Sequence, residues 1–391
     1  MRVFLAVVLV VLCYTHGISS QTVVDCDVVV AGGSTASLAT ALSAAEAALA
    51  APGGNETIVC YTEITDWVGG QMSAGGVPAI DFGGLNRNTA NQPASFVDFF
   101  NFFPGNPGAC SVSIKCYLPN VFVEEWAMPR LQKLPNLRLF LRTTIVNTTR
   151  DASGRISSLR AVQRTPRDRN EEWTKNLSEE LEDWYSEEDS AMFTKEVLEL
   201  RGSVFVEATE LGDVLATGDF RWLQGVESPT EESWTTQSTC GQAWTLTFYL
   251  ERLAAPSPDH KPIPPGNPAG GSIPNPESFD WHHSWSWRRS HCAGNTSLEA
   301  TNVGDVTQQN LANDLDTAYL LVDSTTGRSQ RPWRGGVNMT ALKMLEDRAY
   351  WYATYMVKNR PSSSWTIDLN YTTAGTKHGL SKFPYLRDTR R

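Results

Sequence analysis

After its N-terminal end the sequence has no long hydrophobic run, since no later stretch approaches the roughly eighteen consecutive apolar residues that a membrane-spanning helix needs. It also lacks an excess of basic residues: 33 Lys and Arg stand against 43 Asp and Glu, for a formal net charge of −10. A chain of that charge repels nucleic acids and anionic lipids. These two absences predict a protein without a membrane span that does not bind nucleic acid.

The first twenty residues, MRVFLAVVLVVLCYTHGISS, run from one Arg through a short apolar block to small residues, which is typical of a secretory signal peptide. We therefore expect a secreted or lumenal protein whose mature chain begins near Gln21. Sequons for N-linked glycans support that compartment, and they occur at Asn55, Asn147, Asn176, Asn295, Asn338 and Asn370.

Removal of Cys13 with the signal peptide leaves an even number of cysteines, Cys26, Cys60, Cys110, Cys116, Cys240 and Cys292. An oxidising compartment permits disulfides, and Cys110 and Cys116 are the easiest local pair. Cys26 and Cys60 lie in apolar, strand-like runs, where we expect buried thiols because a bridge between adjacent strands would strain a regular sheet.

The mature chain opens with a strand, a turn and a helix. Val28 to Val30 form a β-branched run, a glycine turn follows, and an Ala- and Leu-rich stretch extends from Ser37 to Leu49. The segment TIVCYTE then supplies a second strand that ends at Glu63. Continuous apolarity in both strands predicts an α/β fold with a parallel sheet buried on both faces.

The turn between the first strand and the helix resembles the G-x-G-x-x-G loop that holds a dinucleotide, with Gly32, Ser34 and Ser37 at the three glycine positions. Ser34 is small enough to offer its N–H to a phosphate at the positive end of the helix, whereas Ser37 should push helix and strand slightly apart. An ordinary turn between strand and helix is the alternative. Glu63 favours the dinucleotide, because a carboxylate there binds a ribose hydroxyl and disfavours NADP.

Other segments show the wider organisation. The six-glycine run ITDWVGGQMSAGGVPAIDFGG fits no regular element. Arg138 to Val162 reads as a β-meander, residues 164–201 are rich in acidic side chains that we expect on a solvated face, and the proline-rich stretch 255–279 reads as an extended linker. From Met339 the apolar residues follow helical spacing.

Several motifs occur in a particular order: DVVVAGGSTAS, WVGGQMSAGG, EATELGD and HGLSKFPYLRDTRR. In that order they resemble FAD-dependent oxidoreductases of the glutathione-reductase-like flavoprotein superfamily. The resemblance implies an FAD cofactor, two-electron transfer on a small molecule, and a Rossmann-like FAD-binding domain with a parallel sheet plus a second, mixed α/β substrate domain. Relatives usually continue past the equivalent of RDTRR, so it also implies a C-terminal truncation.

The resemblance also assigns roles to residues and boundaries to domains. It implies that the FAD pyrophosphate lies at Gly32, Gly33, Ser34 and Ser37, and that Glu63 binds the adenosine ribose. It places the adenine at the backbone of Val146 and the pyrophosphate and flavin end near Gly69, Gly70 and Gln71. A second glycine-containing turn, at Ala208, Thr209 and Gly212 with Asp213 beside it, would return to the cofactor. We expect a signal peptide at 1–20, the first part of the FAD-binding domain at 21–163, an acidic insert at 164–201, a return segment at 202–219, and an incomplete substrate-domain-like region at 220–391.

No motif marks a catalytic residue. His282 and His283, flanked by tryptophans, could line a pocket near the flavin, but we favour ordinary, partly buried histidines, and their spacing with Cys292 matches no usual metal site. Trp281, Trp285 and Trp287 could stack against a sugar, although packing as an edge strand or loop is favoured. The alternative function is therefore a non-catalytic secreted glycoprotein that keeps the fold and binds carbohydrate.

Overall fold

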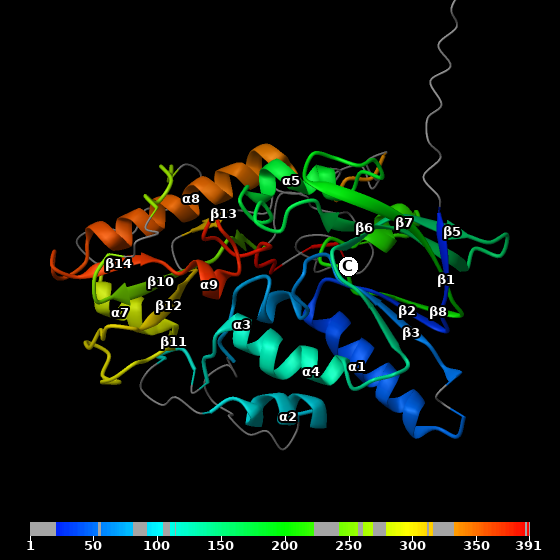
Figure 1. Ribbon diagram of the computed structural model, residues 1–391, viewed down its shortest axis with the longest axis horizontal. Helices are drawn as coiled ribbons and strands as arrows, with labels where there is room; N and C mark the ends of the chain where they lie inside the picture. Colours follow the sequence, from blue (N-terminus) through cyan, green and yellow to red (C-terminus); the bar gives the residue numbers. More distant parts are fainter. Residues whose placement is uncertain are drawn as a thin grey trace, which may run out of the picture.

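The computed structural model describes residues 21–53, 56–80, 92–104, 110–113, 115–222, 242–256, 261–268, 279–310, 313–315, 332–387 and 389–390. Within these residues the chain forms the mixed α/β fold that the sequence predicts. A parallel sheet lies at one end of the molecule and an antiparallel sheet at the other (Figure 1).

The parallel sheet contains four short strands in the order β4-β3-β2-β8. The two central strands, β2 and β3, are almost completely buried, as expected for a sheet covered on both faces, whereas β4 and β8 are mostly half-buried. The helix α1 follows β2 directly and packs on β2 and β3. The bounds are β2 Val28–Ala31, α1 Thr35–Ala50, β3 Val59–Thr62, β4 Leu137–Phe140 and β8 Val204–Glu207. The predicted opening of strand, turn, helix and strand is confirmed.

A second sheet, in the order β1-β7-β6-β5, lies beside the parallel one. Its strands are β1 Thr22–Asp25, β5 Thr143–Arg150, β6 Ile156–Pro166 and β7 Phe193–Arg201. The prediction of a single meander over Arg138 to Val162 is therefore partly wrong: β5 and β6 form the hairpin, but β4 pairs with β3 in the parallel sheet. The sequence of β4 alternates like an edge strand, which does not reveal its partner.

The acidic stretch 164–201 contributes the end of β6, helix α5 (Leu177–Trp184) and β7. The expected solvated face is correct for the exposed side chains Glu171, Glu179, Glu182 and Glu188. It is wrong for two others. Glu172 is buried and forms a bidentate pair with Arg142, at 2.5 and 3.0 Å, and Glu180 is buried on the inner side of α5.

Three helical segments cover the outer side of α1. They carry an aromatic cluster in which Phe99 meets Phe122 and Trp126 edge to face, with ring centroids 5.7 and 5.2 Å apart. The segments are α2 Ala94–Phe102, α3 Pro119–Val121 continued by the π-helical turn η4 Phe122–Ala127, and α4 Met128–Leu131.

The other half of the molecule is built on the antiparallel sheet β11-β12-β10-β14 and the long helix α8, which confirms the helix predicted from Met339. The largest hydrophobic core lies here. The elements are β9 Trp244–Thr245, β10 Phe248–Leu253, α7 Trp281–Trp287, β11 Arg289–His291, β12 Val306–Gln309, β13 Asp314–Leu315, α8 Met339–Lys358, β14 Thr366–Leu369 and α9 Tyr371–Ala374. No helix among the described residues is long and apolar enough to cross a membrane.

Two disulfides are present among the described residues. Cys110 pairs with Cys116, as predicted. Cys26 also pairs with Cys60, so the expectation of two buried thiols is wrong. The physical reason is that Cys26 lies between β1 and β2, outside the ladder of the parallel sheet, and its Cα is 6.0 Å from that of Cys60. The disulfide therefore joins the segment between β1 and β2 to strand β3, and it does not distort the pairing of two regular strands. Cys240 lies outside the described residues, and Cys292 is unpaired.

The two bridges differ in the length of chain that they close. We expect Cys26→Ala to lower the free energy of unfolding by about 4 kcal/mol and Cys110→Ala by about 2 kcal/mol, because the loop-entropy cost grows with sequence separation, which is 34 and 6 residues. Chemical denaturation without reductant measures both values. A larger loss for Cys110→Ala would contradict this order.

Candidate functional site

The first glycine turn lies between β2 and α1, at the carboxyl edge of the parallel sheet. A Cβ on Gly32 would lie 2.2 Å from the carbonyl oxygen of Thr62 and 2.5 Å from the ring of Tyr61. The Gly32 N–H also donates to the Thr62 hydroxyl at 3.1 Å. The turn therefore contacts β3 so closely that only glycine fits, which is the tight approach that a dinucleotide loop requires.

The two serines are integral to this turn. Ser34 is the N-cap of α1, and its hydroxyl accepts the Ser37 N–H at 3.2 Å. The buried Ser37 hydroxyl in turn accepts the N–H groups of Gly33 and Ser34, at 3.2 and 3.1 Å. Ser37 therefore fixes the loop through hydrogen bonds, a role that the sequence pattern does not reveal.

The second turn meets the first. The hydroxyl of Ser34 donates to the carbonyl oxygen of Ala208 at 2.7 Å, which joins the residues after β8 to the start of α1. Thr209 follows, and its hydroxyl accepts the Asp213 N–H at 2.8 Å. Gly212 is the residue before the short helix α6 (Asp213–Thr217). Both predicted turns thus lie together, although they are far apart in the sequence.

Glu63 directly follows β3 and is completely buried. One of its carboxyl oxygens accepts the Tyr61 hydroxyl at 3.0 Å, and the other, Oε1, has no hydrogen-bond partner among the described residues. Burial raises the pKa of Glu63 to about 8, with Glu210 adding to the rise and the Tyr61 hydrogen bond opposing it. The carboxyl predicted to bind a ribose therefore lies at the expected edge, with one acceptor left free.

Glu210 is a site residue that the sequence analysis missed. A Cβ on Gly70 would lie 2.6 Å from Glu210 Oε1 and 2.5 Å from Ser34 Cα, so this carboxyl lies against the first glycine loop. Burial raises the pKa of Glu210 to about 8. The motif EATELGD contains it, but nothing in the spacing distinguishes it from a surface residue. Tyr61 was missed as well, and its position two residues before Glu63, on the same face of a strand, was the available signal.

The segment Gly69 to Gln71, which the sequence analysis places along the cofactor, lies next to the first glycine turn. Gly69 precedes the 3₁₀ turn η2 (Gly70–Met72), and its carbonyl oxygen accepts the Thr35 hydroxyl at 2.9 Å. Gly70 has φ +54, so it occupies the left-handed region that favours glycine. Gln71 is exposed. In the structure Gly69 and Gly70 thus lie against the start of α1.

Val146 and Asp213 lie at the border of this site. The pairing of β5 with β6 shifts register between Ile145 and Asn147, so Val146 has no partner in the ladder. The Asp213 carboxylate accepts hydrogen bonds from Trp333 Nε1 at 2.7 Å and from the Tyr185 hydroxyl at 3.1 Å. Burial, and next the charge of Glu207, raise the pKa of Asp213 to about 7.

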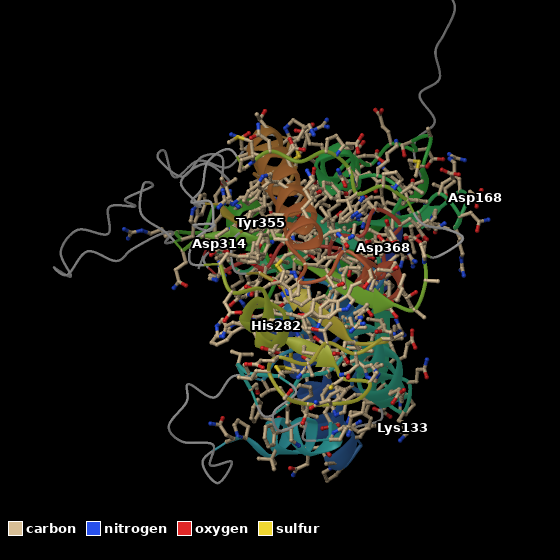
Figure 2. All side chains as sticks on the ribbon, turned by 90° about the vertical axis from the view of Figure 1, so that its left-hand side faces the viewer. Lys133, Asp168, His282, Asp314, Tyr355 and Asp368 are labelled. Atoms are coloured by element: carbon tan, nitrogen blue, oxygen red, sulfur yellow. A yellow bond between two sulfur atoms is a disulfide. The ribbon has the colours of Figure 1, made fainter. Side chains whose placement is uncertain are left out.

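The histidines and tryptophans of α7 are distant from this site, because α7 and α1 lie in opposite halves of the molecule (Figure 1). In the end-on view His282 lies on α7 below Tyr355 of α8 (Figure 2). His282 is half-buried, as favoured above, whereas His283 is exposed. Trp281 and Trp285 are buried core residues in a helix, so the expected edge strand or loop is wrong. The described residues contain no group of three or more His, Cys, Asp or Glu that could hold a metal ion.

No family model matches the sequence, and no curated protein matches it. Among solved structures the chain is similar to an L-proline dehydrogenase from P. horikoshii, with 14% identity, a TM-score of 0.24, and coverage of 53% of this chain and 25% of that chain. It is also similar to a variant of the FrdA chain of E. coli quinol fumarate reductase, with 10% identity, a TM-score of 0.31, and coverage of 88% and 72%. Similarity at this level does not establish a shared function, and the chain spans only about a quarter of the dehydrogenase.

The raised pKa of Glu63 predicts a dependence of stability on pH. In the folded protein the carboxyl keeps its proton up to about pH 8, whereas the unfolded chain loses it near the ordinary value of 4.5. The free energy of unfolding should therefore fall as the pH rises from 5 to 8, by up to about 1.4 kcal/mol per pH unit for this group. Glu63→Gln cannot ionise, so its urea-unfolding free energy should fall less steeply over the same range.

The control for this measurement is Glu188→Gln, which removes an exposed carboxyl from the acidic stretch. Its slope should match that of the parent protein. Parallel slopes for the parent and Glu63→Gln would show that Glu63 is already ionised in the folded protein.

Proposed function

We propose that the protein binds FAD at the carboxyl edge of the parallel sheet and acts as an FAD-dependent oxidoreductase on a small molecule. One observation carries this proposal. Two glycine turns and a buried carboxyl, from three separate parts of the chain, converge at the ends of the adjacent strands β2, β3 and β8.

The strand order supports a nucleotide at this edge. From β2 the chain continues to β3 on one side, and it returns to β8 on the other. Ligands of open parallel sheets bind where the order reverses in this way, outside the carboxyl ends of the strands. The positive end of the sixteen-residue helix α1 lies at the same point, which favours the negative charge of a pyrophosphate.

The residues present fit FAD in three respects. Gly32 and Gly70 let the backbone segments approach one another closely. Glu63 Oε1 is a buried acceptor that has no partner in the described part of the chain, and a ribose hydroxyl would satisfy it. The backbone of Val146, which has no partner in the strand ladder, is assigned to the adenine. We assign the flavin end to the side of Gly69, Gly70 and Gln71.

The fit of FAD to this site depends on the protonation state of Glu210. An ionised carboxylate against the glycine loop would repel a pyrophosphate, but the pKa of Glu210 is raised to about 8, so the neutral form predominates at pH 7. A neutral carboxyl donates a hydrogen bond instead of repelling the anion. Tyr61 and Ser37 connect Glu63 to the loop through hydroxyl contacts of 3.0 and 3.3 Å.

When bound, FAD would supply the two-electron chemistry. The chain's own contribution is position: Ser34 joins the two turns, Thr35 fixes Gly69, and Glu63 orients the adenosine end. The half of the molecule built on the antiparallel sheet would then hold the substrate. Secretion is part of the proposal, and two disulfides support it, since disulfides persist in oxidising compartments.

A non-catalytic glycoprotein that keeps the fold without the cofactor is the second candidate. It is favoured by the Gly33 and Ser34 N–H groups, which already donate to Ser37. The carbohydrate site suggested for this alternative loses its support, because buried Trp281 and Trp285 cannot stack against a sugar.

Flavin binding tests the proposal. The purified protein should show flavin absorption bands after incubation with FAD, and Gly32→Val should abolish them because a side chain there meets the Thr62 carbonyl at 2.2 Å. Glu63→Leu should weaken binding by about two- to tenfold, because it removes the acceptor that the neutral carboxyl offers to a ribose hydroxyl. Ser37→Gly should leave binding unchanged or tighten it, because it frees the Gly33 and Ser34 N–H groups for the pyrophosphate.

The matched control for Gly32→Val is Ala47→Val, at an exposed position of α1, the helix that follows Gly32. It should bind FAD as the parent does. Absence of flavin bands in the parent protein, with excess FAD, would favour the second candidate. Equal binding by the parent and Gly32→Val would show that FAD does not bind at this loop.

Glycan positions provide a second test, because the sequons differ in their surroundings. Asn295 and Asn338 are exposed, and so is Asn147. The amide nitrogen of half-buried Asn370 donates to Glu251 at 2.8 Å, and the side chain of Asn176 accepts the Tyr350 hydroxyl at 2.7 Å. Peptide mass spectrometry of the secreted protein should find glycans at the three exposed sites and an unmodified Asn370. Full occupancy of Asn370 would contradict the structure around it.

A further inference from the structure

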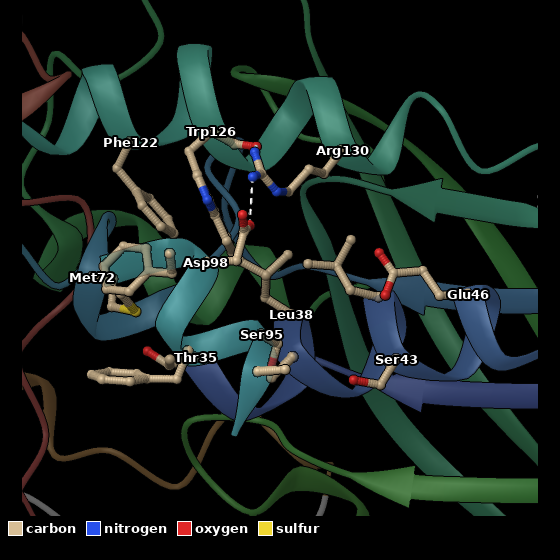
Figure 3. Close-up of a pocket in the computed structure, with 15 residues that line it drawn as sticks. Thr35, Leu38, Ser43, Glu46, Met72, Ser95, Asp98, Phe122, Trp126 and Arg130 are labelled. Carbon is tan, nitrogen blue, oxygen red and sulfur yellow. Dashed lines mark hydrogen bonds and ion pairs between the residues drawn. The ribbon is translucent and has the colours of Figure 1, made fainter. Parts of the chain in front are cut away.

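A cavity of about 450 Å³ lies on the outer side of α1, between α1, α2 and the helical segment formed by α3, η4 and α4 (Figure 3). This volume is in the range of sites for small organic molecules. Its walls carry Phe96, Phe99, Phe122 and Trp126, and the exposed small residues Ala39 and Ser43 of α1 form its floor. None of the roles proposed above uses this space.

The walls are shaped for a flat molecule. Phe122 and Trp126 stack with ring centroids 5.4 Å apart and an interplanar angle of 20°, while Phe99 meets Trp126 edge to face at 5.2 Å. Aromatic ligands add favourably to both arrangements. Small side chains on the floor allow such a ligand to approach the α1 backbone closely.

One polar group in the wall is unsatisfied. Trp126 is buried, and its indole Nε1–H has no acceptor in the part of the chain that the structure describes. Figure 3 shows the Trp126 side chain pointing from its helix into the space above α1 and α2. Buried donors normally find a partner, so an acceptor atom on a bound molecule would complete this one. Trp126 and Phe122 also belong to η4, and rare π-helical turns frequently occur at functional sites.

The charges at the rim indicate an uncharged ligand. Arg130 and Asp98 pair across the mouth at 2.5 Å, so they largely cancel each other (Figure 3). Glu46 is the other charged lining residue and is exposed. It disfavours an anion, and the remaining polar side chains of the lining are the neutral hydroxyls of Thr35, Ser43 and Ser95.

We propose that this cavity binds an uncharged aromatic molecule of two or three rings that carries a carbonyl oxygen, and that the carbonyl accepts the Trp126 Nε1–H. The rings lie against the aromatic wall and over Ala39. The site is separate from the proposed FAD site, although Thr35 and Met72 lie at the border of both.

Benzophenone and diphenylmethane test this proposal, since they differ only in the carbonyl group. Isothermal titration of the full chain should show saturable binding of one benzophenone, with diphenylmethane about fivefold weaker because it leaves the indole donor unpaired. Trp126→Phe keeps a ring but removes the donor, so the two affinities should become equal. Ultraviolet irradiation should crosslink benzophenone to peptides of α1, α2 or η4.

Two substitutions on α1 form a matched pair that does not depend on Trp126. Ala39 and Ala47 are both exposed, but only Ala39 lines the cavity. Ala39→Phe should abolish binding and crosslinking by filling the floor, and Ala47→Phe should change neither. The proposal is overturned by the absence of saturable binding, by crosslinks confined to other peptides, by an affinity ratio that Trp126→Phe leaves unchanged, or by normal binding to Ala39→Phe.

Discussion

The close contact between Gly32 and β3 is the constraint on which the site depends. Because the turn touches the Thr62 carbonyl and the Tyr61 ring, α1 begins directly at the carboxyl edge of the sheet. That position lets Ser34 reach the carbonyl of Ala208, which brings the return strand β8 and its turn to the same edge. A larger residue at Gly32 would displace the start of α1 and separate the two turns.

Burial of carboxyl groups is the second feature that defines this edge. Glu63, Glu210 and Asp213 all have raised pKa values, with burial as the largest cause in each. A site with so many acids would repel an anionic cofactor if all were ionised. The neutral forms of Glu63 and Glu210, which predominate at pH 7, can instead donate hydrogen bonds, so their protonation makes the acidic edge compatible with a pyrophosphate. The same burial lowers the stability of the folded protein as the pH rises.

The sequence predicted the elements that local pattern determines. The opening strand, turn and helix and the long helix from Met339 are confirmed because apolar periodicity and glycine turns encode them within a few residues. The sequence analysis failed for features that depend on contacts between residues far apart in the sequence. The pairing of β4 with β3 and the bridge from Cys26 to Cys60 depend on contacts across the sheet. Glu210 escaped notice because its role comes from its neighbours, Ser34 and Gly70, and not from its own motif.

Hydrogen–deuterium exchange of the full chain, measured with and without FAD, tests the central claim most directly. If the pyrophosphate binds at the carboxyl edge of the parallel sheet, FAD should slow exchange in peptides that contain the Gly32 to Ser37 turn, the Glu63 to Gln71 segment and the Ala208 to Gly212 turn. Peptides from β10 to β12 of the antiparallel sheet provide the internal reference. Unchanged exchange in all three segments, or protection confined to the antiparallel sheet, would contradict the proposal that this edge holds the cofactor.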